Sequence, residues 1–262
     1  MIRLVVNAEE FGATPAADDG ILKAHHDGIV TSTALAGNAA DPVAARTALA
    51  NAPALGVGLS LALIGGHPVA SAGDVGTLLA SDGALRRGAA DFSFDWFKQA
   101  IAPAHVEREL EAQIARALDA GLALDHLCSR GHLAFLPGVG EIVERLARRH
   151  HIAGIRTTVD PPTLGWITDP VRGVRNGVLA GLSWFTRRRL GALRHGPRTW
   201  GYFESGHLDE VRILEIVGRL GPGAHELVCH PAGDELRALM STKVRTAIER
   251  RGILLSRWRD LF

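Results

Sequence analysis

Short apolar runs alternate with amphipathic segments along the chain, and this alternation predicts strands that pair in parallel with helices between them. The runs most typical of buried strands are residues 2–6, 28–39, 55–64, 124–133 and 225–231. A further strand is expected at residues 154–162, where Pro161 and Pro162 break it. Apolar positions at helical spacing predict helices at residues 15–28, 41–52, 102–121, 138–151, 206–220 and 234–252. A barrel or a doubly wound sheet is expected, with a short closing strand near the C-terminus.

Length and composition narrow the class of protein. The 262 residues, 47% of them hydrophobic, fit one α/β domain over 1–262. The formal net charge of +1 gives no case for nucleic acid. No apolar stretch approaches the roughly 18 residues of a transmembrane helix. No signal peptide precedes the first strand, and Cys128 and Cys229 lie far apart, so we expect a cytoplasmic protein without a disulfide framework.

Polar side chains follow the predicted strands, where parallel α/β barrels carry their active sites. The set consists of Asn7, Glu9, Glu10, Ser60, Cys128, Arg130, His132, Arg156 and His230, with His207 at the start of a helix. For His132 and His230, a site role and a structural role stay open. Cys128 fits a small core residue better than a nucleophile.

Glu9 and Glu10 stand together at the end of the first predicted strand, in the stretch VVNAEEFG. One interpretation is a solvated pair at a loop entry. The other is a site, because two adjacent carboxylates raise each other's pKa unless a metal ion or an arginine lies between them.

Two long segments are expected to shape the mouth of a pocket. Residues 67–92 lack periodicity and predict a long loop, and the mouth is expected to extend over 67–97. Residues 172–200 carry Arg187, Arg188, Arg189, Arg194 and Arg198. The arginine run fits a solvated face or, with the aromatic residues beside it, a surface for an anionic or lipid substrate.

Several of these stretches together resemble the YdjC-like family, the ChbG/HpnK carbohydrate deacetylases. They are VVNAEEFG, GILKAHHDGIVTSTAL, LGVGLSLAL, LDHLCSRGHLAFLP, WGYFESGH and ELVCHPA, in order over nearly the whole chain. The segments ADFSFDWF and SGHLDEVRIL look closest to the hopanoid-associated HpnK branch. The resemblance implies a distorted parallel (β/α) barrel that hydrolyses the N-acetyl group of amino sugars with a divalent metal.

The chain departs from the family pattern at the positions where the metal would bind. The family has two aspartates, a general base and a ligand, where this chain has Glu9 and Glu10. Ser60 and Arg130 stand at the places of ligand histidines, and Cys128 at the place of an aspartate. His132 is retained, while the last histidine of that run is Ala134. An arginine cannot ligate a metal because it stays protonated.

The sequence therefore predicts a family member with a metal-independent acid/base site, in which Arg130 replaces the metal charge and pairs with Glu10. The expected catalytic residues are Glu9, Glu10, His132 and His230. The expected substrate-binding residues are Asn7, Ser60, Cys128, Arg130, Arg156 and His207. The expected partner is a small molecule such as an amino sugar or glycolipid, and a homodimer stays open.

Two alternatives remain at this point. One is a rebuilt zinc or magnesium site formed by Glu10, Cys128 and His132, since thiolate and imidazole favour zinc. The other is a non-catalytic sugar- or lipid-binding protein that keeps the barrel.

Overall fold

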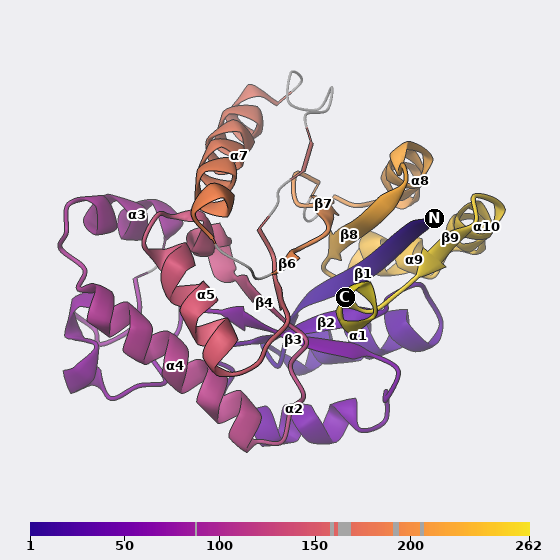
Figure 1. Cartoon of the computed structure of the whole chain (residues 1–262). Helices are drawn as coiled ribbons and strands as arrows, with labels where there is room; N and C mark the ends of the chain where they lie inside the picture. Colours follow the sequence, from indigo (N-terminus) through magenta and orange to yellow (C-terminus); the bar gives the residue numbers. More distant parts are fainter. Residues whose placement is uncertain (87, 158–159, 162–168, 191–193, 205–206) are drawn as a thin grey trace.

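The strands form one sheet that pairs in parallel and curls toward a barrel (Figure 1). This computed structural model describes residues 1–86, 88–157, 160–161, 169–190, 194–204 and 207–262. The strand order is β6-β5-β4-β3-β2-β1-β8-β7, and β9 pairs with the beginning of β1. The strands are β1 Ile2–Phe11, β2 Ser32–Ala36, β3 Gly56–Leu61, β4 His126–Ser129, β5 Gly154–Ile155, β6 Arg194–His195, β7 Arg198–Trp200, β8 Gly223–Cys229 and β9 Ile253–Leu255.

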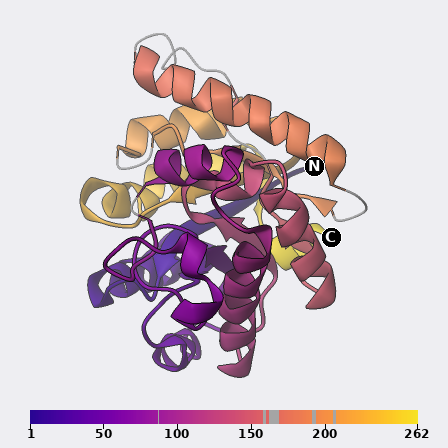
Figure 2. The same cartoon turned by 90° about the vertical axis from the view of Figure 1, so that its left-hand side faces the viewer.

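Helices connect the strands and cover the sheet (Figures 1 and 2). The α-helices are α1 Pro15–His26, α2 Pro42–Leu49, α3 Ala89–Phe97, α4 Pro103–Asp119, α5 Val139–Arg149, α7 Pro170–Arg189, α8 Glu210–Arg219, α9 Gly233–Leu239 and α10 Thr242–Arg250. Short 3₁₀ segments are η1 Ala72–Asp74, η2 Gly76–Leu78, η3 Arg130–Phe135, which is kinked at Gly131 and His132, and η4 Trp258–Leu261. Among the described helices, none is long and apolar enough to cross a membrane.

The two ends of the sheet lie close together, which explains the curl. Strands β6 and β7 stand at opposite ends of the strand order, yet only Gly196 and Pro197 separate them in the chain. Three residue steps span at most about 11 Å, only about two strand spacings. The sheet therefore curves until its edges nearly meet, and the predicted distorted parallel (β/α) barrel is confirmed.

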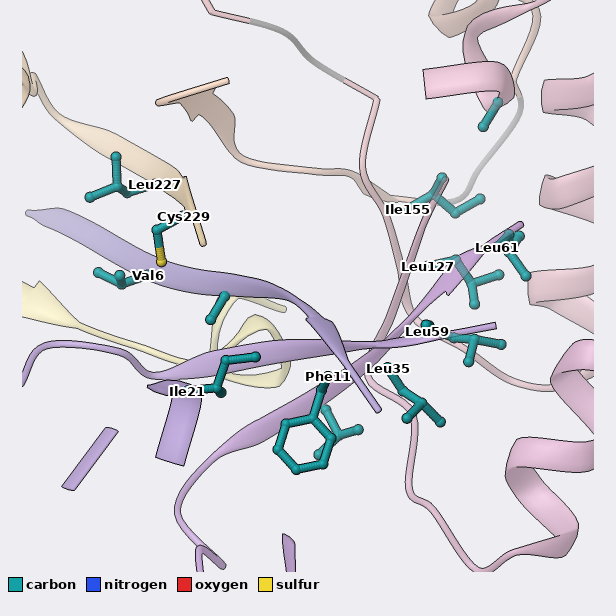
Figure 3. Close-up of a cluster of buried hydrophobic side chains, with 14 of the residues drawn as sticks. Val6, Phe11, Ile21, Leu35, Leu59, Leu61, Leu127, Ile155, Leu227 and Cys229 are labelled. Carbon is teal, nitrogen blue, oxygen red and sulfur yellow. The ribbon is translucent and has the colours of Figure 1, made fainter. Parts of the chain in front are cut away.

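The core between sheet and helices is built from the apolar strand residues (Figure 3). Val6, Leu35, Leu59 and Leu227 come from four strands and are at most 1% exposed. These strands are buried on both faces, which is why they read as continuous apolar runs rather than as alternating patterns.

Helix α4 carries two buried polar side chains that fix the loop after β3. The Gln113 amide donates to the carbonyl of Ala62 at 2.7 Å and accepts from its N–H at 2.8 Å. Glu109 accepts hydrogen bonds from the N–H groups of Val69 and Ala70. These contacts hold the loop at the carboxyl edge of the sheet, where its carbonyl groups face Arg130.

Three predicted elements need correction. The expected loop over 67–92 ends earlier, because α3 begins at Ala89. The expected helix over 234–252 is two helices, since the hydroxyl of Ser241 caps a new helix by accepting from the N–H groups of Lys243 and Val244. Of the strand expected over residues 154–162, the structure shows the two residues of β5, and residues 158, 159 and 162 lie outside the described residues.

Candidate active site

A β-bulge at the end of β1 separates the two neighbouring glutamates. Ala8 pairs with Thr33 and Phe11 with Leu35, so β1 holds one residue more than β2 in this interval. Glu10 adopts a left-handed backbone with φ of 70° and is exposed. The Glu9 side chain is 17% exposed and faces the site. The two carboxylates therefore do not act as a pair: that of Glu9 lies in the site, and that of Glu10 lies in solvent.

The centre of the site is a buried cluster of two carboxylates around one guanidinium. Arg156, which follows β5, donates Nε to Glu226 Oε2 at 2.9 Å and Nη2 to Glu226 Oε1 at 2.6 Å. Its Nη1 is ion-paired with Glu9 Oε1. The side chains of Arg156 and Glu226 are 2% and 0% exposed. We call Glu9, Arg156 and Glu226 the charged cluster.

The charged cluster keeps Glu9 ionised. Burial alone would raise the pKa of Glu9, but the charge and hydrogen bond of Arg156 outweigh it. Electrostatic interactions with His230 and His132 act in the same direction, and together they lower the pKa of Glu9 to about 2. Glu9 is therefore an anion at neutral pH, held in place by a guanidinium.

His132 lies beside Glu9 in an aromatic setting. Its ring stacks on Phe135 at 5.1 Å between centroids and meets the edge of Tyr202 at 4.0 Å. Burial, aided by the charges of Arg156 and Arg175 and opposed by Glu9, lowers the pKa of His132 to about 4. Its backbone φ of 56°, like that of Glu10, is rare for a residue other than glycine. Such conformations cluster at functional sites.

Asn7, Ser60 and Cys128 are buried residues of β1, β3 and β4. Burial raises the pKa of the Cys128 thiol to about 12, so the thiol stays protonated. Ser60 lies opposite Cys128 in the β3–β4 register. Both polar atoms of the Asn7 side chain are buried without a hydrogen-bond partner among the described residues. Because orphaned buried amides are rare, Asn7 is a candidate to bind water or a ligand.

Arg130 does not occupy the place expected for it. Its Nη1 lies 3.3 Å from Asn38 Oδ1 and from the Ile64 carbonyl oxygen, and 3.4 Å from that of Gly65. Within the described ranges no ion pair joins Arg130 to Glu10. The expected pair is therefore corrected: the loop carbonyl groups after β3 take the Arg130 guanidinium, and Arg156 is the cation beside the strand-end carboxylate.

His207 and His230 line one pocket, and His230 also interacts electrostatically with Glu9 of the charged cluster. The pocket has a volume of about 520 Å³ and is also lined by Asp209, Arg212 and Glu235. His207 is exposed, whereas His230 is half-buried and its main-chain N–H donates to Glu235. His230 thus reaches both the pocket and the electrostatic surroundings of Glu9, while His207 lies on the outer wall.

Three residues of the site are not among the predicted ones. Glu226 stands inside an apolar strand, and a charge there needs a buried partner, which is the signal that could have found it. Tyr202 covers His132. Asp160 accepts hydrogen bonds from the N–H groups of Tyr202 and Phe203 and so fixes the Tyr202 turn. Burial raises the pKa of Asp160 to about 7.

A curled parallel sheet with carboxylates and imidazoles at its carboxyl edge defines the class of α/β-barrel proteins with a polar site at the strand ends. The family model described as YdjC-like protein matches residues 3–250. The chain therefore belongs to the YdjC-like family, which confirms the resemblance seen in the sequence.

Known proteins agree with this assignment. A carbohydrate deacetylase of Geobacillus stearothermophilus is 30% identical over 233 residues, which cover 87% of this chain and 78% of that protein. A carbohydrate deacetylase of Brevibacillus brevis is 37% identical over 151 residues, which are 58% of this chain and only 58% of that relative's length. A crystal structure of an Enterococcus faecalis V583 protein has a TM-score of 0.80 at 23% identity and covers 99% of this chain and 98% of its own. This last similarity establishes the fold.

Acidification is expected to destabilise the protein in two stages. Unfolded His132 would bind a proton below about pH 6.5, while the folded imidazole, facing Glu9, Arg156, Arg175, Tyr202 and Phe135, binds one only below about 4. Unfolding thus takes up a proton in this range, and the free energy of unfolding falls by on the order of 3 kcal/mol from pH 6.5 to 4. The pKa of Glu9 is lowered from 4.5 to about 2, so the free energy of unfolding falls further as the pH drops from about 4.5 to about 2.

Urea unfolding at a series of pH values from 8 to 4 measures this slope. The matched variant is His132→Asn, because asparagine tolerates the left-handed backbone at this position. The variant should flatten the slope between pH 6.5 and 4. An unchanged slope would mean that other groups cause the acid sensitivity.

Proposed function

We propose that this chain is a carbohydrate-deacetylase-like hydrolase with a metal-independent acid/base site. Its substrate is an amino sugar, a glycolipid or a related small molecule that carries an N-acyl group. Support for the reaction comes from the YdjC-like family and from curated relatives named carbohydrate deacetylase. The HpnK-like branch assignment stays a prediction.

One observation carries the metal-independent site: a buried guanidinium already balances the strand-end carboxylate. Arg156 is bound to both Glu9 and Glu226 inside the curled sheet. Its positive charge would repel a divalent cation placed against Glu9. The charge balance for which the family resemblance implies a metal is thus supplied by this chain's own residue.

The donor groups also fit a metal ion poorly. Burial raises the pKa of the Cys128 thiol to about 12, which opposes formation of the thiolate that metal ligation requires. The His132 ring is enclosed by Phe135 and Tyr202, and Glu10 is exposed on the far side of the bulge. In the described part of the chain, no three His, Cys, Asp or Glu side chains are grouped to hold a metal. We therefore assign no step to one.

The proposed chemistry is proton transfer by imidazole. Water attacks the acyl carbon and gives its proton to His230, the C–N bond breaks, and the amine leaves with a proton from the His230 imidazolium. Glu9 stabilises the imidazolium electrostatically and is not itself the base, because a carboxylate with a pKa of about 2 accepts protons poorly at neutral pH. The orphaned amide of Asn7, on the same face of β1 as Glu9, is placed to pair with the acyl amide.

Metal removal tests this proposal. Purified protein is analysed for bound transition metals and magnesium, and acetate release is then measured on a panel of N-acetylated sugars and glycolipids with and without chelator. We expect substoichiometric metal and equal turnover in both conditions. Stoichiometric zinc whose removal abolishes turnover, with recovery on adding zinc back, would establish the rebuilt metal site instead.

Variants of the two histidines, assayed on the same panel of substrates, test whether they take part in catalysis. His230→Asn is expected to lower turnover at least about 100-fold while the fold is retained by circular dichroism. His132→Asn is expected to lower it less, because burial lowers the pKa of His132 to about 4 and makes its ring a poor proton acceptor at neutral pH. Tight sugar binding without turnover on any panel member would identify a binding protein rather than an enzyme.

A further inference from the structure

Helix α7 is polar on its buried face. Asn176, Ser183 and Thr186 are 0%, 5% and 2% exposed. Thr186 Oγ1 donates to the carbonyl of Phe135 at 2.6 Å, and Ser183 Oγ donates to that of Thr157. An ordinary surface helix turns its apolar side inward, so the polarity of α7 is inverted.

The buried face holds α7 against the candidate active site. Phe135 stacks on His132, and Thr157 follows Arg156 in the chain. The Arg175 guanidinium lies 5.4 Å above the ring of Tyr202, whose edge meets His132. The helix therefore lies against the candidate active site with a fixed orientation, and its outer face points away from the site.

The outer face of α7 is an exposed apolar stripe. Its members follow one another at helical spacing: Val171, Val174, Val178 and Phe185, which are 80%, 69%, 57% and 43% exposed. Trp184, beside the stripe, is 58% exposed. Both views show α7 at the periphery of the molecule (Figures 1 and 2). Contiguous exposed apolar surface marks an interaction site.

All charged residues of α7 are also of one sign. Its twenty residues contain five arginines and no acidic residue, and Arg187, Arg188 and Arg189 form the last turn. The guanidinium of Arg188 lies 4.0 Å from the Trp184 ring and that of Arg189 5.3 Å from the Phe185 ring. Apolar side chains next to a cationic, aromatic-rich end are typical of helices that lie in a membrane interface.

We propose that the outer face of α7 binds the surface of an anionic lipid bilayer, with the candidate active site directly beneath the helix. Negative lipid headgroups complement the arginines, and the valines and Phe185 enter the headgroup boundary. A second copy of the chain fits this face less well, because a symmetric dimer would bring two cationic helices together. The proposal concerns binding and does not depend on the proposed reaction.

Vesicle sedimentation tests the proposal with the full chain. We expect binding to vesicles of phosphatidylglycerol and phosphatidylcholine, weak binding to phosphatidylcholine alone, and weaker binding as salt increases. The triple variant Val174→Ser, Val178→Ser and Phe185→Ser should lower the vesicle affinity at least about tenfold. Arg187→Gln with Arg188→Gln should lower it and reduce its salt dependence.

The matched control changes exposed valines elsewhere. Val43 on α2 and Val211 on α8 are 59% and 62% exposed, and Val43→Ser with Val211→Ser should leave vesicle binding unchanged. All variants are compared at equal folded fraction by circular dichroism. Two results would overturn the proposal: no binding to anionic vesicles, or equal losses in the control. A dimer in light scattering that the triple variant dissociates, without vesicle binding, would assign the face to a second copy.

Discussion

Replacing Arg156 with methionine is expected to lower the free energy of unfolding by about 3–5 kcal/mol. The substitution leaves Glu9 and Glu226 near each other in a buried space without their shared cation. Methionine fills much of the volume of the arginine side chain, so the decrease in the free energy of unfolding reflects the missing charge rather than a packing defect. Urea unfolding at pH 7 measures it, and the difference should shrink as the pH falls and protonation removes the uncompensated charges.

Arg145→Met is the matched control, because Arg145 makes the same bidentate contact to a glutamate at the surface. Its Nε and Nη2 lie 3.1 Å and 2.8 Å from the two oxygens of Glu107, and its side chain is 49% exposed. We expect a loss within about 1 kcal/mol there. Equal losses at both positions would contradict the view that the charged cluster is a buried, desolvated unit.

Much of the fold follows from local pattern. The four apolar residues of α4 at helical spacing, Val106, Leu110, Ile114 and Leu118, predict its core side, and the first three are fully buried. The strands next to β1 are buried on both sides, which the continuous apolar runs indicate directly. Patterns of this kind report burial, and burial sets the layers of an α/β barrel.

Short and capped elements could not be predicted in the same way. Strand β5 has two residues, too few for any period to appear. The break between α9 and α10 depends on a single Ser241 hydroxyl, while the apolar spacing continues across it. These features are decided by hydrogen bonds to specific backbone groups rather than by hydrophobic pattern.

The candidate site, too, could be predicted from the sequence only in part. Residues at strand ends indicate which side chains share an edge, and Glu9, His132 and Arg156 do lie together. The partners within the edge depend on strand order and backbone turns. The left-handed turn at Gly131 and His132 follows Arg130 directly, and the Arg130 guanidinium lies on carbonyl groups of the β3 loop, away from Glu10. Arg156 comes close to Glu9 only because the sheet curls.

Glu9→Gln is expected to lower kcat by about 10²–10⁴-fold with little change in KM. The amide keeps the shape of the side chain but removes the anion that stabilises an imidazolium at His230. It also releases one of the two carboxylates that hold Arg156, while the bidentate contact to Glu226 remains. Steady-state acetate release on the panel sugar that gives turnover measures kcat and KM separately.

Glu10→Gln is the informative comparison, because it is the same substitution on the adjacent residue. Glu10 is exposed and, among the described residues, forms no ion pair, so its loss should cost less than about tenfold in kcat. The order of the two effects distinguishes the mechanisms. If Glu10→Gln has the larger effect, the exposed carboxylate performs the proton transfer, and the charged cluster of Glu9, Arg156 and Glu226 is a structural element of the barrel interior. If Glu9→Gln has the larger effect, the bulge in β1 has a chemical purpose: it separates an anion fixed for catalysis from a neighbour that solvent screens.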